Sequence, residues 1–189
     1  MGAIHGAAAP ETKEMSTPQQ PGWWDKGTCW RANRGFGPSC LEAAVLLDIP
    51  DIRQSGESDC GPAVFRAVAK FHGIRGATVP DHSEQYGLSP DALETAFRVN
   101  GLRVLSGEMD IDILRAITNR GWPVVCLVTT EESVGHYVVI RGVERQSVFY
   151  HCPSDGRCKL RIEDFDARWY DRSRYKVEYV KYGCAVFKS

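Results

Sequence analysis

Two residues of this chain, a cysteine and a histidine, lie in sequence settings suited to covalent chemistry. Cys60 stands directly before an apolar stretch with helical spacing, within RQSGESDCGPAVFRAVAKFHG. The start of a helix favours the thiolate, which is the reactive form of cysteine, through its free backbone N–H groups and its dipole. His136 opens the apolar stretch HYVVIRG, and a histidine can take the thiol proton and later return it to a leaving amine. The two residues predict nucleophilic catalysis, with Cys60 as nucleophile and His136 as general base.

A third residue, Gln54, lies six positions before Cys60, far enough for a turn to bring its side-chain amide back to the sulfur. An amide N–H at that place, together with the backbone N–H of Cys60, would stabilise the oxyanion of a tetrahedral intermediate. Losing one such donor typically costs about 10²–10³ in rate. We therefore expect Gln54 to be the side-chain donor of an oxyanion hole.

The segment after Cys60 has the spacing of a helix that packs on a core. Apolar residues recur at i, i+3, i+4 and i+7 from Val64 to Phe71, and Pro62 suits the first turn. Similar signals predict helices over about 89–101 and 112–120, and one or two helical turns within 41–47. The nucleophile is therefore expected at the beginning of the first clear helix.

Strand patterns follow the helices. Apolar runs predict strands at 123–128, 137–140, 147–150 and, near the end, 178–187. Helices followed by a run of strands indicate an α+β fold, with a helical part packed on an antiparallel sheet. Residues 1–22, rich in Ala, Pro, Gly and Gln, are expected to form a flexible arm. Residues 23–189 are expected to form one domain, with an irregular N-terminal cover at 23–50.

Composition narrows the classes of function. The chain has 189 residues, 43% of them hydrophobic, which is enough for one domain with a buried core. Its formal net charge of −1 argues against a nucleic-acid or anionic-membrane partner. Seven scattered cysteines do not form a disulfide framework, and no signal peptide or membrane span is evident. We expect a cytoplasmic protein without a cofactor or metal; its oligomeric state cannot be read from the sequence.

Three motifs taken together resemble the bacteriocin-processing peptidase family. They are Q-x5-C-G-P from Gln54, G-L-S-P-D-A-L from Gly87 and G-H-Y-V-V-I-R-G from Gly135, and the resemblance spans about residues 52–153. It implies a papain-like cysteine peptidase that removes double-glycine leader peptides, often as the front domain of an export transporter. No transporter part accompanies these motifs, so the resemblance implies a stand-alone version. The substrate it implies is a peptide or small protein.

The chain departs from this family at one position. The family has Asp-Pro about sixteen residues after its histidine, and that Asp orients the imidazole, whereas this chain has Cys152-Pro153. A thiol stabilises an imidazolium poorly compared with a carboxylate. Three alternatives stay open: Asp155 supplies the carboxylate from the next turn, the enzyme works as a Cys–His dyad, or the protein no longer cleaves.

The sequence also leaves the chemistry of this region partly open. Cys152 and Cys158 flank a turn and could form a disulfide, or bind zinc with His151 and one more ligand; we favour two free thiols. His72 and His82 are expected at the surface. Cysteine peptidase activity competes with two other hypotheses, a non-catalytic module that binds a leader peptide and a transamidase that uses the same Cys–His pair.

Overall fold

The computed structural model describes residues 44–79, 81–82, 87–130, 135–172 and 178–188. The predicted arm at 1–22 and most of the predicted cover lie outside the described residues. The described part of the cover, 44–50, contains no helix, so the helical turns predicted within 41–47 are wrong for the part that can be checked. Two causes are visible. Pro50 disfavours helical backbone just before it, and the backbone of Leu47 bonds to the sheet, its N–H lying 2.7 Å from the carbonyl oxygen of Arg141.

The chain begins with two helices, and two further helices are interspersed among the strands that follow. The helices are α1 Cys60–Phe71, α2 Pro90–Val99, α3 Ile111–Thr118 and α4 Ile162–Asp166. The strands are β1 Arg103–Glu108, β2 Val124–Val128, β3 His136–Val143, β4 Ser147–Cys152, β5 Gly156–Arg161, β6 Tyr170–Arg172, β7 Glu178–Val180 and β8 Tyr182–Phe187. The three predicted helices and the four predicted strand regions are all found.

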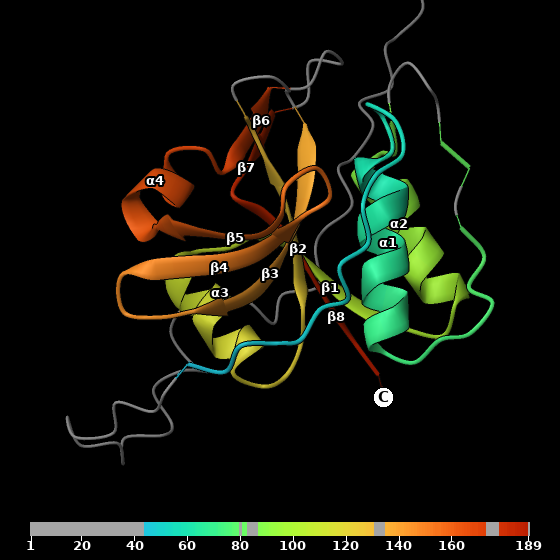
Figure 1. The fold of residues 1–189 in the computed structure, drawn as a ribbon, viewed down its shortest axis with the longest axis horizontal. Helices are drawn as coiled ribbons and strands as arrows, with labels where there is room; N and C mark the ends of the chain where they lie inside the picture. Colours follow the sequence, from blue (N-terminus) through green and yellow to red (C-terminus); the bar gives the residue numbers. More distant parts are fainter. Residues whose placement is uncertain (1–43, 80, 83–86, 131–134, 173–177, 189) are drawn as a thin grey trace, which may run out of the picture. The chain divides into compact units, whose positions relative to one another are not determined.

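Six strands form one sheet in the order β1-β8-β2-β3-β4-β5, and every neighbouring pair is antiparallel. Strands β6 and β7 form a separate two-stranded sheet. In Figure 1, α1 and α2 cover one face of the large sheet, and α3 and α4 lie on its other side. The prediction of an α+β fold with helices on an antiparallel sheet is confirmed.

Helix starts follow local capping chemistry. Ser89 caps α2, its Oγ accepting from the N–H of Ala92 at 3.3 Å, and Asp110 caps α3 in the same way from Ile113 at 2.8 Å. Asp59 occupies the same position before α1, but its side chain makes no capping bond. The carboxylate of Asp59 instead contacts Ser55 and His82.

The core has two layers, one on each face of the sheet. All five residues of β2 are buried. Val125 and Leu127 pack with α1 and α2, whereas Val124, Cys126 and Val128 pack with α3. Burying one such aliphatic side chain contributes about 1.5–3 kcal/mol. Because both faces are covered, the strand reads as a continuous apolar run in place of an alternating one.

Three strands were not predicted from the sequence: β6, which lies in the small sheet, and β1 and β5, which are the two edges of the large sheet. Their burial pattern is mixed, with exposed Arg103 and Glu108 at the ends of β1. Polar edge strands protect a sheet from pairing with other chains, and the same polarity removes the apolar pattern that predicts a strand. Among the described residues, no helix is long and apolar enough to cross a lipid bilayer.

Candidate active site

The predicted nucleophile, Cys60, is the first residue of α1 and is buried. Gly61 after it is required by packing, since a Cβ at that position would lie 2.7 Å from Cβ of Leu88. The hydroxyl of Tyr137 donates to the carbonyl oxygen of the same Leu88 at 2.9 Å. Burial raises the pKa of Tyr137, and the neighbouring Cys60 sulfur raises it further. The residue that follows His136 is therefore within electrostatic reach of Cys60.

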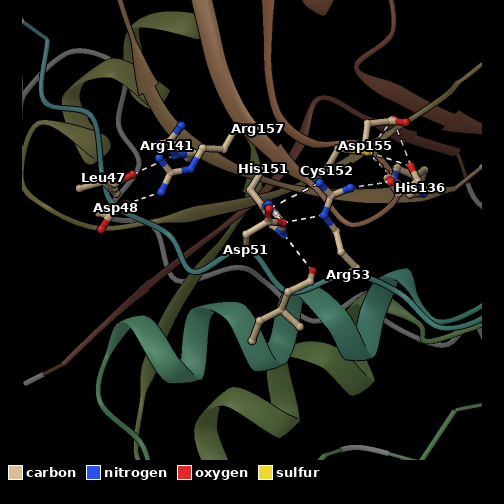
Figure 2. Close-up of polar contacts among 12 residues, drawn as sticks. Leu47, Asp48, Asp51, Arg53, His136, Arg141, His151, Cys152, Asp155 and Arg157 are labelled. Carbon is tan, nitrogen blue, oxygen red and sulfur yellow. Dashed lines mark hydrogen bonds and ion pairs between the residues drawn. The ribbon is translucent and has the colours of Figure 1, made fainter.

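His136 begins β3 and is also buried, with 5% of its surface exposed. Its Nε2 lies 3.3 Å from Sγ of Cys152, at the end of β4. The same sulfur lies 3.2 Å from Oδ2 of Asp155 and 3.0 Å from Oγ of Ser154. Figure 2 shows the resulting chain of polar contacts from the imidazole through the thiol to the carboxylate.

Proton positions follow from these contacts. Burial raises the pKa of Cys152, which favours the protonated thiol. With its one hydrogen donated to Oδ2 of Asp155, the sulfur can only accept from Nε2–H of His136. A neutral imidazole protonated on Nε2 carries its basic lone pair on Nδ1. The arrangement thus selects the tautomer that a general base needs.

Two predicted neighbours are not joined directly. Asp155 reaches His136 through the sulfur of Cys152, and no hydrogen bond links the carboxylate to the imidazole in the described part of the chain. Likewise, no hydrogen bond joins Sγ of Cys60 to His136 among the described residues. Catalytic hydrogen bonds are often long or poorly aligned before substrate binds.

A strap, defined here as residues 44–54, runs along the sheet to the start of α1 (Figure 1) and is hydrogen-bonded to side chains of β3, β4 and β5. Figure 2 shows how the strand side chains hold it. The contacts are Nε of Arg141 to the carbonyl oxygen of Leu47 at 2.9 Å, Nη2 of Arg157 to Asp48 at 2.5 Å, Nε2 of His151 to the carbonyl oxygen of Ile52 at 3.0 Å, and Nη1 of Arg53 to the carbonyl oxygen of Ser154 at 2.7 Å. Gly156, with φ of +85°, leaves room for the guanidinium of Arg53. Hydrogen bonds therefore hold the strap in place from Leu47 to Arg53.

Gln54 ends this strap. Its backbone N–H donates to the carbonyl oxygen of Pro153 at 3.1 Å, which fixes it beside the strand end that carries Cys152. Its side-chain Nε2 donates to the carbonyl oxygen of Gly56 at 3.0 Å, and its Oε1 is buried without a partner in the described part of the chain. A primary amide has two N–H groups, so one donor remains for an oxyanion.

The loop between Gln54 and Cys60 is held by Asp59. Its carboxylate accepts a short hydrogen bond from Ser55 and lies 2.8 Å from Nε2 of His82. The hydrogen bond from Ser55, followed by that from His82, lowers the pKa of Asp59. His82 was expected at the surface and is exposed there, although its side chain, 26% exposed, is partly covered by this contact. No sequence pattern signals its contact with Asp59, because 23 residues separate them.

Two further buried polar residues were not predicted as site residues. Asp171 in β6 is buried close to Gly135, the residue before His136. His151, considered above only as a zinc ligand, is wholly buried and holds the strap. Neither lies in a recognisable motif. Hydrophobic periodicity cannot find such residues, because their burial depends on distant segments.

Among the described residues, no group of three or more His, Cys, Asp or Glu side chains is arranged to hold a metal ion. Cys152 and Cys158 are both free thiols. A buried thiol at a helix start, a histidine of defined tautomer and a free amide donor can support acyl transfer.

Comparison with known proteins agrees with this geometry. The sequence model of the peptidase C39 family matches residues 48–173. No curated protein matches the chain by sequence. A putative C39-like peptidase from Bacillus anthracis has a similar structure over 78% of this chain and 99% of its own, with 15% identity and a TM-score of 0.58.

Two transporter peptidase domains are also similar. One is a double-glycine-motif protease from an AMS/PCAT transporter, solved with its leader peptide, with 15% identity, a TM-score of 0.56 and coverage of 76% of this chain and 94% of that one. The other is the peptidase domain of Streptococcus ComA, with 19% identity, a TM-score of 0.55 and coverage of 73% and 97%. At these identities the likeness concerns the fold. Since the family match spans more than half of the sequence, the chain belongs to the peptidase C39 family.

Proposed function

We propose that this protein is a cysteine peptidase that hydrolyses a peptide bond in a peptide or small protein. The observation that carries the proposal is the contact of 3.3 Å between Nε2 of His136 and Sγ of Cys152, backed by Asp155. It keeps the proton on Nε2 and the basic lone pair on Nδ1. Together with Cys60 at the start of α1, this supplies a base and a nucleophile.

The reaction begins when Nδ1 of His136 takes the thiol proton of Cys60 and the thiolate attacks the scissile carbonyl carbon. The oxyanion that forms accepts from the backbone N–H of Cys60 and from Nε2 of Gln54. Collapse expels the amine, which takes the proton from His136 and leaves a thioester on Cys60. Water then attacks the thioester, giving its proton to His136, and the acid product leaves as Cys60 is protonated again.

Asp155 and Cys152 act as positioning residues in this scheme. The imidazolium is stabilised by the Cys152 sulfur, which Asp155 polarises through the hydrogen bond of 3.2 Å. Charge-assisted hydrogen bonds to a direct carboxylate contribute about 1.5–3 kcal/mol. A thiol placed between the two groups transmits only part of this, so we expect a functional but slower enzyme than one with a direct Asp.

A peptide with a double-glycine leader is the substrate class that we propose. A protease of similar fold was solved with its leader peptide, and its name describes a double-glycine motif. Family membership supports the same class of substrate here. Small residues at the cleavage site would suit a nucleophile that is itself only 8% exposed.

The test combines a thiol-reactive probe with a double-glycine peptide substrate. Wild type is expected to be labelled and to cleave, while Cys60→Ala loses cleavage by at least about 10³-fold, as removal of a nucleophile does. Cys158→Ser is the matched control, because Cys158 is a partly exposed free thiol outside the scheme. Equal cleavage by wild type and Cys60→Ala would refute the proposal.

Product mass separates the competing activities. Hydrolysis adds water to the acyl product, whereas a transamidase would add the amine offered as acceptor. Tight binding of the peptide by wild type without cleavage would favour a non-catalytic module. The observation that favours this second candidate is Cys152 in the position that the family gives to an aspartate.

A further inference from the structure

One buried carboxylate of the described chain is left without a counter-charge. Asp171 in β6 is 6% exposed, and its Oδ1 has no hydrogen-bond partner in the described part of the chain. Burial raises its pKa. Buried charged groups are normally paired or hydrogen-bonded, so a carboxylate without a partner among the described residues is suited to receive a cation.

This carboxylate lies next to the catalytic histidine. A Cβ built on Gly135 would stand 3.3 Å from Oδ2 of Asp171. Gly135 has φ of +79° and immediately precedes His136, whose Cα is therefore about 3.8 Å from that of Gly135. A peptide bound at His136 would therefore place side chains within about two residues of its scissile bond close to Asp171.

The carboxylate also faces the side of the sheet on which Cys60 lies. Asp171 pairs with Tyr179 across β6 and β7, and directly opposed residues of antiparallel strands share a face. Tyr179 packs against the buried cluster that contains Cys60 and Tyr137. The pKa of Tyr137 is raised by burial, by Cys60 and, among smaller contributions, by Asp171. The nucleophile and the carboxylate thus act on the same phenol.

The surroundings of Asp171 are negative. Burial raises the pKa of Tyr179, and three carboxylates, Asp91, Asp171 and Glu94, raise it further. Glu94 already has partners, Arg98 at 2.9 Å and the hydroxyl of Tyr182 at 2.9 Å. Neither Asp91 nor Asp171 has an ion pair in the described part of the chain. Asp91 and Asp171 therefore have no compensating cation within the part of the chain that the structure describes.

We propose that Asp171 forms a subsite for a basic side chain, arginine or lysine, that lies next to the scissile bond of the peptide substrate. The proposal rests on the proposed peptidase function and specifies its substrate further. The cation pairs with the carboxylate of Asp171, whose buried Oδ1 has no partner among the described residues. Tyr179 adds an aromatic ring on the same face, on which a guanidinium readily stacks. Asp91 contributes to the attraction from the start of α2.

The experiment compares matched peptides that differ only in charge. Double-glycine peptides carry, at one position at a time within about three residues of the bond, either arginine or its neutral isostere citrulline. Lysine and norleucine form a second pair. We expect wild type to prefer the basic member at one position by about tenfold or more in kcat/KM, as for a hydrogen bond to a charged group. Asp171→Asn should bring this ratio close to one.

The ratio between matched peptides cancels any general effect of a substitution on the enzyme. Asp164→Asn is the control, since Asp164 is an exposed carboxylate of α4 and its replacement removes the same charge elsewhere. It should leave the ratio near the wild-type value. A ratio near one for wild type at every position overturns the subsite, as does a preference that survives in Asp171→Asn.

Binding separates this proposal from the peptidase proposal. The dissociation constants of the same peptides are measured with Cys60→Ala, with and without Asp171→Asn. If wild type cleaves nothing but Cys60→Ala still prefers arginine over citrulline through Asp171, the subsite stands and the peptidase function falls. If Cys60→Ala binds none of the arginine peptides, or binds the pairs equally, the subsite is wrong whatever the cleavage assay shows.

Discussion

Two histidines on neighbouring strands of the large sheet are both buried, yet their surroundings give them different tasks. His136 in β3 is 5% exposed, and its Nε2 meets the thiol of Cys152 with a carboxylate behind it. His151 in β4 is fully buried, and its Nε2 meets the backbone carbonyl of Ile52 in the strap. Figure 2 shows both side chains, His136 beside Cys152 and Asp155 and His151 beside the strap.

The two histidines differ in the group that Nε2 contacts, and in whether that group can stabilise a protonated ring. A backbone carbonyl only accepts, so it fixes the ring of His151 as a donor and holds the strap in place. Burial lowers the pKa of His151, which keeps that ring neutral. By contrast, the thiol of Cys152 and the carboxylate of Asp155 can together stabilise the positive charge of a protonated His136 ring. Burial alone therefore does not distinguish the two histidines; the group that Nε2 of each ring contacts does.

The largest expected effect comes from replacing each ring by glutamine. Gln keeps an amide N–H that can replace Nε2–H, but it has no basic nitrogen. His136→Gln should lower kcat by at least about 10²-fold, because general base catalysis is lost. His151→Gln keeps the donor to Ile52 and should change kcat by less than about threefold. Steady-state cleavage of a double-glycine peptide by both variants measures the contrast.

Circular dichroism of both variants serves as the folding control. Equal losses of kcat in two folded variants would contradict the division of roles between His136 and His151. The opposite order, with His151→Gln the slower enzyme, would indicate that His151 in β4 is the general base.

A smaller effect is expected when the carboxylate is moved one step towards the imidazole. The double variant Cys152→Asp with Asp155→Asn places a single carboxylate in the position of the sulfur. A direct hydrogen bond to the imidazolium should raise kcat by about tenfold, because contacts to charged groups are stronger than contacts through a thiol. The acid limb of the pH–rate profile reports the stabilised imidazolium.

The single variant Asp155→Asn tests whether Asp155 acts on His136 through the sulfur of Cys152. It should lower kcat by a few-fold and leave KM nearly unchanged, since Asp155 acts through Cys152 and not on the peptide. An unchanged kcat in Asp155→Asn would show that the enzyme works as a Cys60–His136 dyad. That result would select one of the alternatives that the sequence left open.

The fold could be predicted because its signals are local, and the assignment of Cys60 and His136 as the reactive pair, which rests on equally local signals, stays a prediction. The helix that begins at Cys60 follows from apolar spacing, and β2 and β3 follow from apolar runs. Edge strands β1 and β5 were missed, since their polar composition is what protects an edge. Cys152 and Asp155 belong to one turn, so their proximity also has a local cause. Their order, with the sulfur in the middle, needed coordinates.

Other features depended on distant segments and left no pattern in the sequence. The contact of His151 with the strap joins residues 99 positions apart. Asp171 is buried beside Gly135 although both its neighbours, Tyr170 and Arg172, give β6 a polar composition. Periodicity reports which face of an element is apolar, not which distant loop covers a polar residue. Buried polar groups are therefore the part of a site that a sequence predicts least well.

The smallest expected effect concerns pH and the strap. Burial, the largest influence, lowers the pKa of His151 below 6.5, while the hydrogen bond to Ile52 and the charge of Asp51 partly oppose this. The unfolded chain therefore binds a proton in this ring at higher pH than the folded chain, and the folded state loses stability as pH falls below about 6.5. Between pH 6.5 and 5.5, one such group can lower the folding equilibrium constant by at most about tenfold.

His151→Gln should remove this part of the pH dependence, because glutamine keeps the donor and does not titrate. His72 is the matched control: its pKa is also lowered by burial, and its Nε2 contacts the carbonyl oxygen of Val186 at 3.1 Å, away from the strap. In both variants, the free energy of unfolding measured with urea should depend less on pH between 5.5 and 7.5 than it does in wild type. Amide exchange separates them, since acid should speed exchange of the Gln54 N–H bonded to Pro153 in wild type and in His72→Gln, but not in His151→Gln. Exchange at Gln54 that responds to acid equally in all three proteins would mean that His151 does not control the strap, and the contrast between the two sheet histidines would then rest on His136 alone.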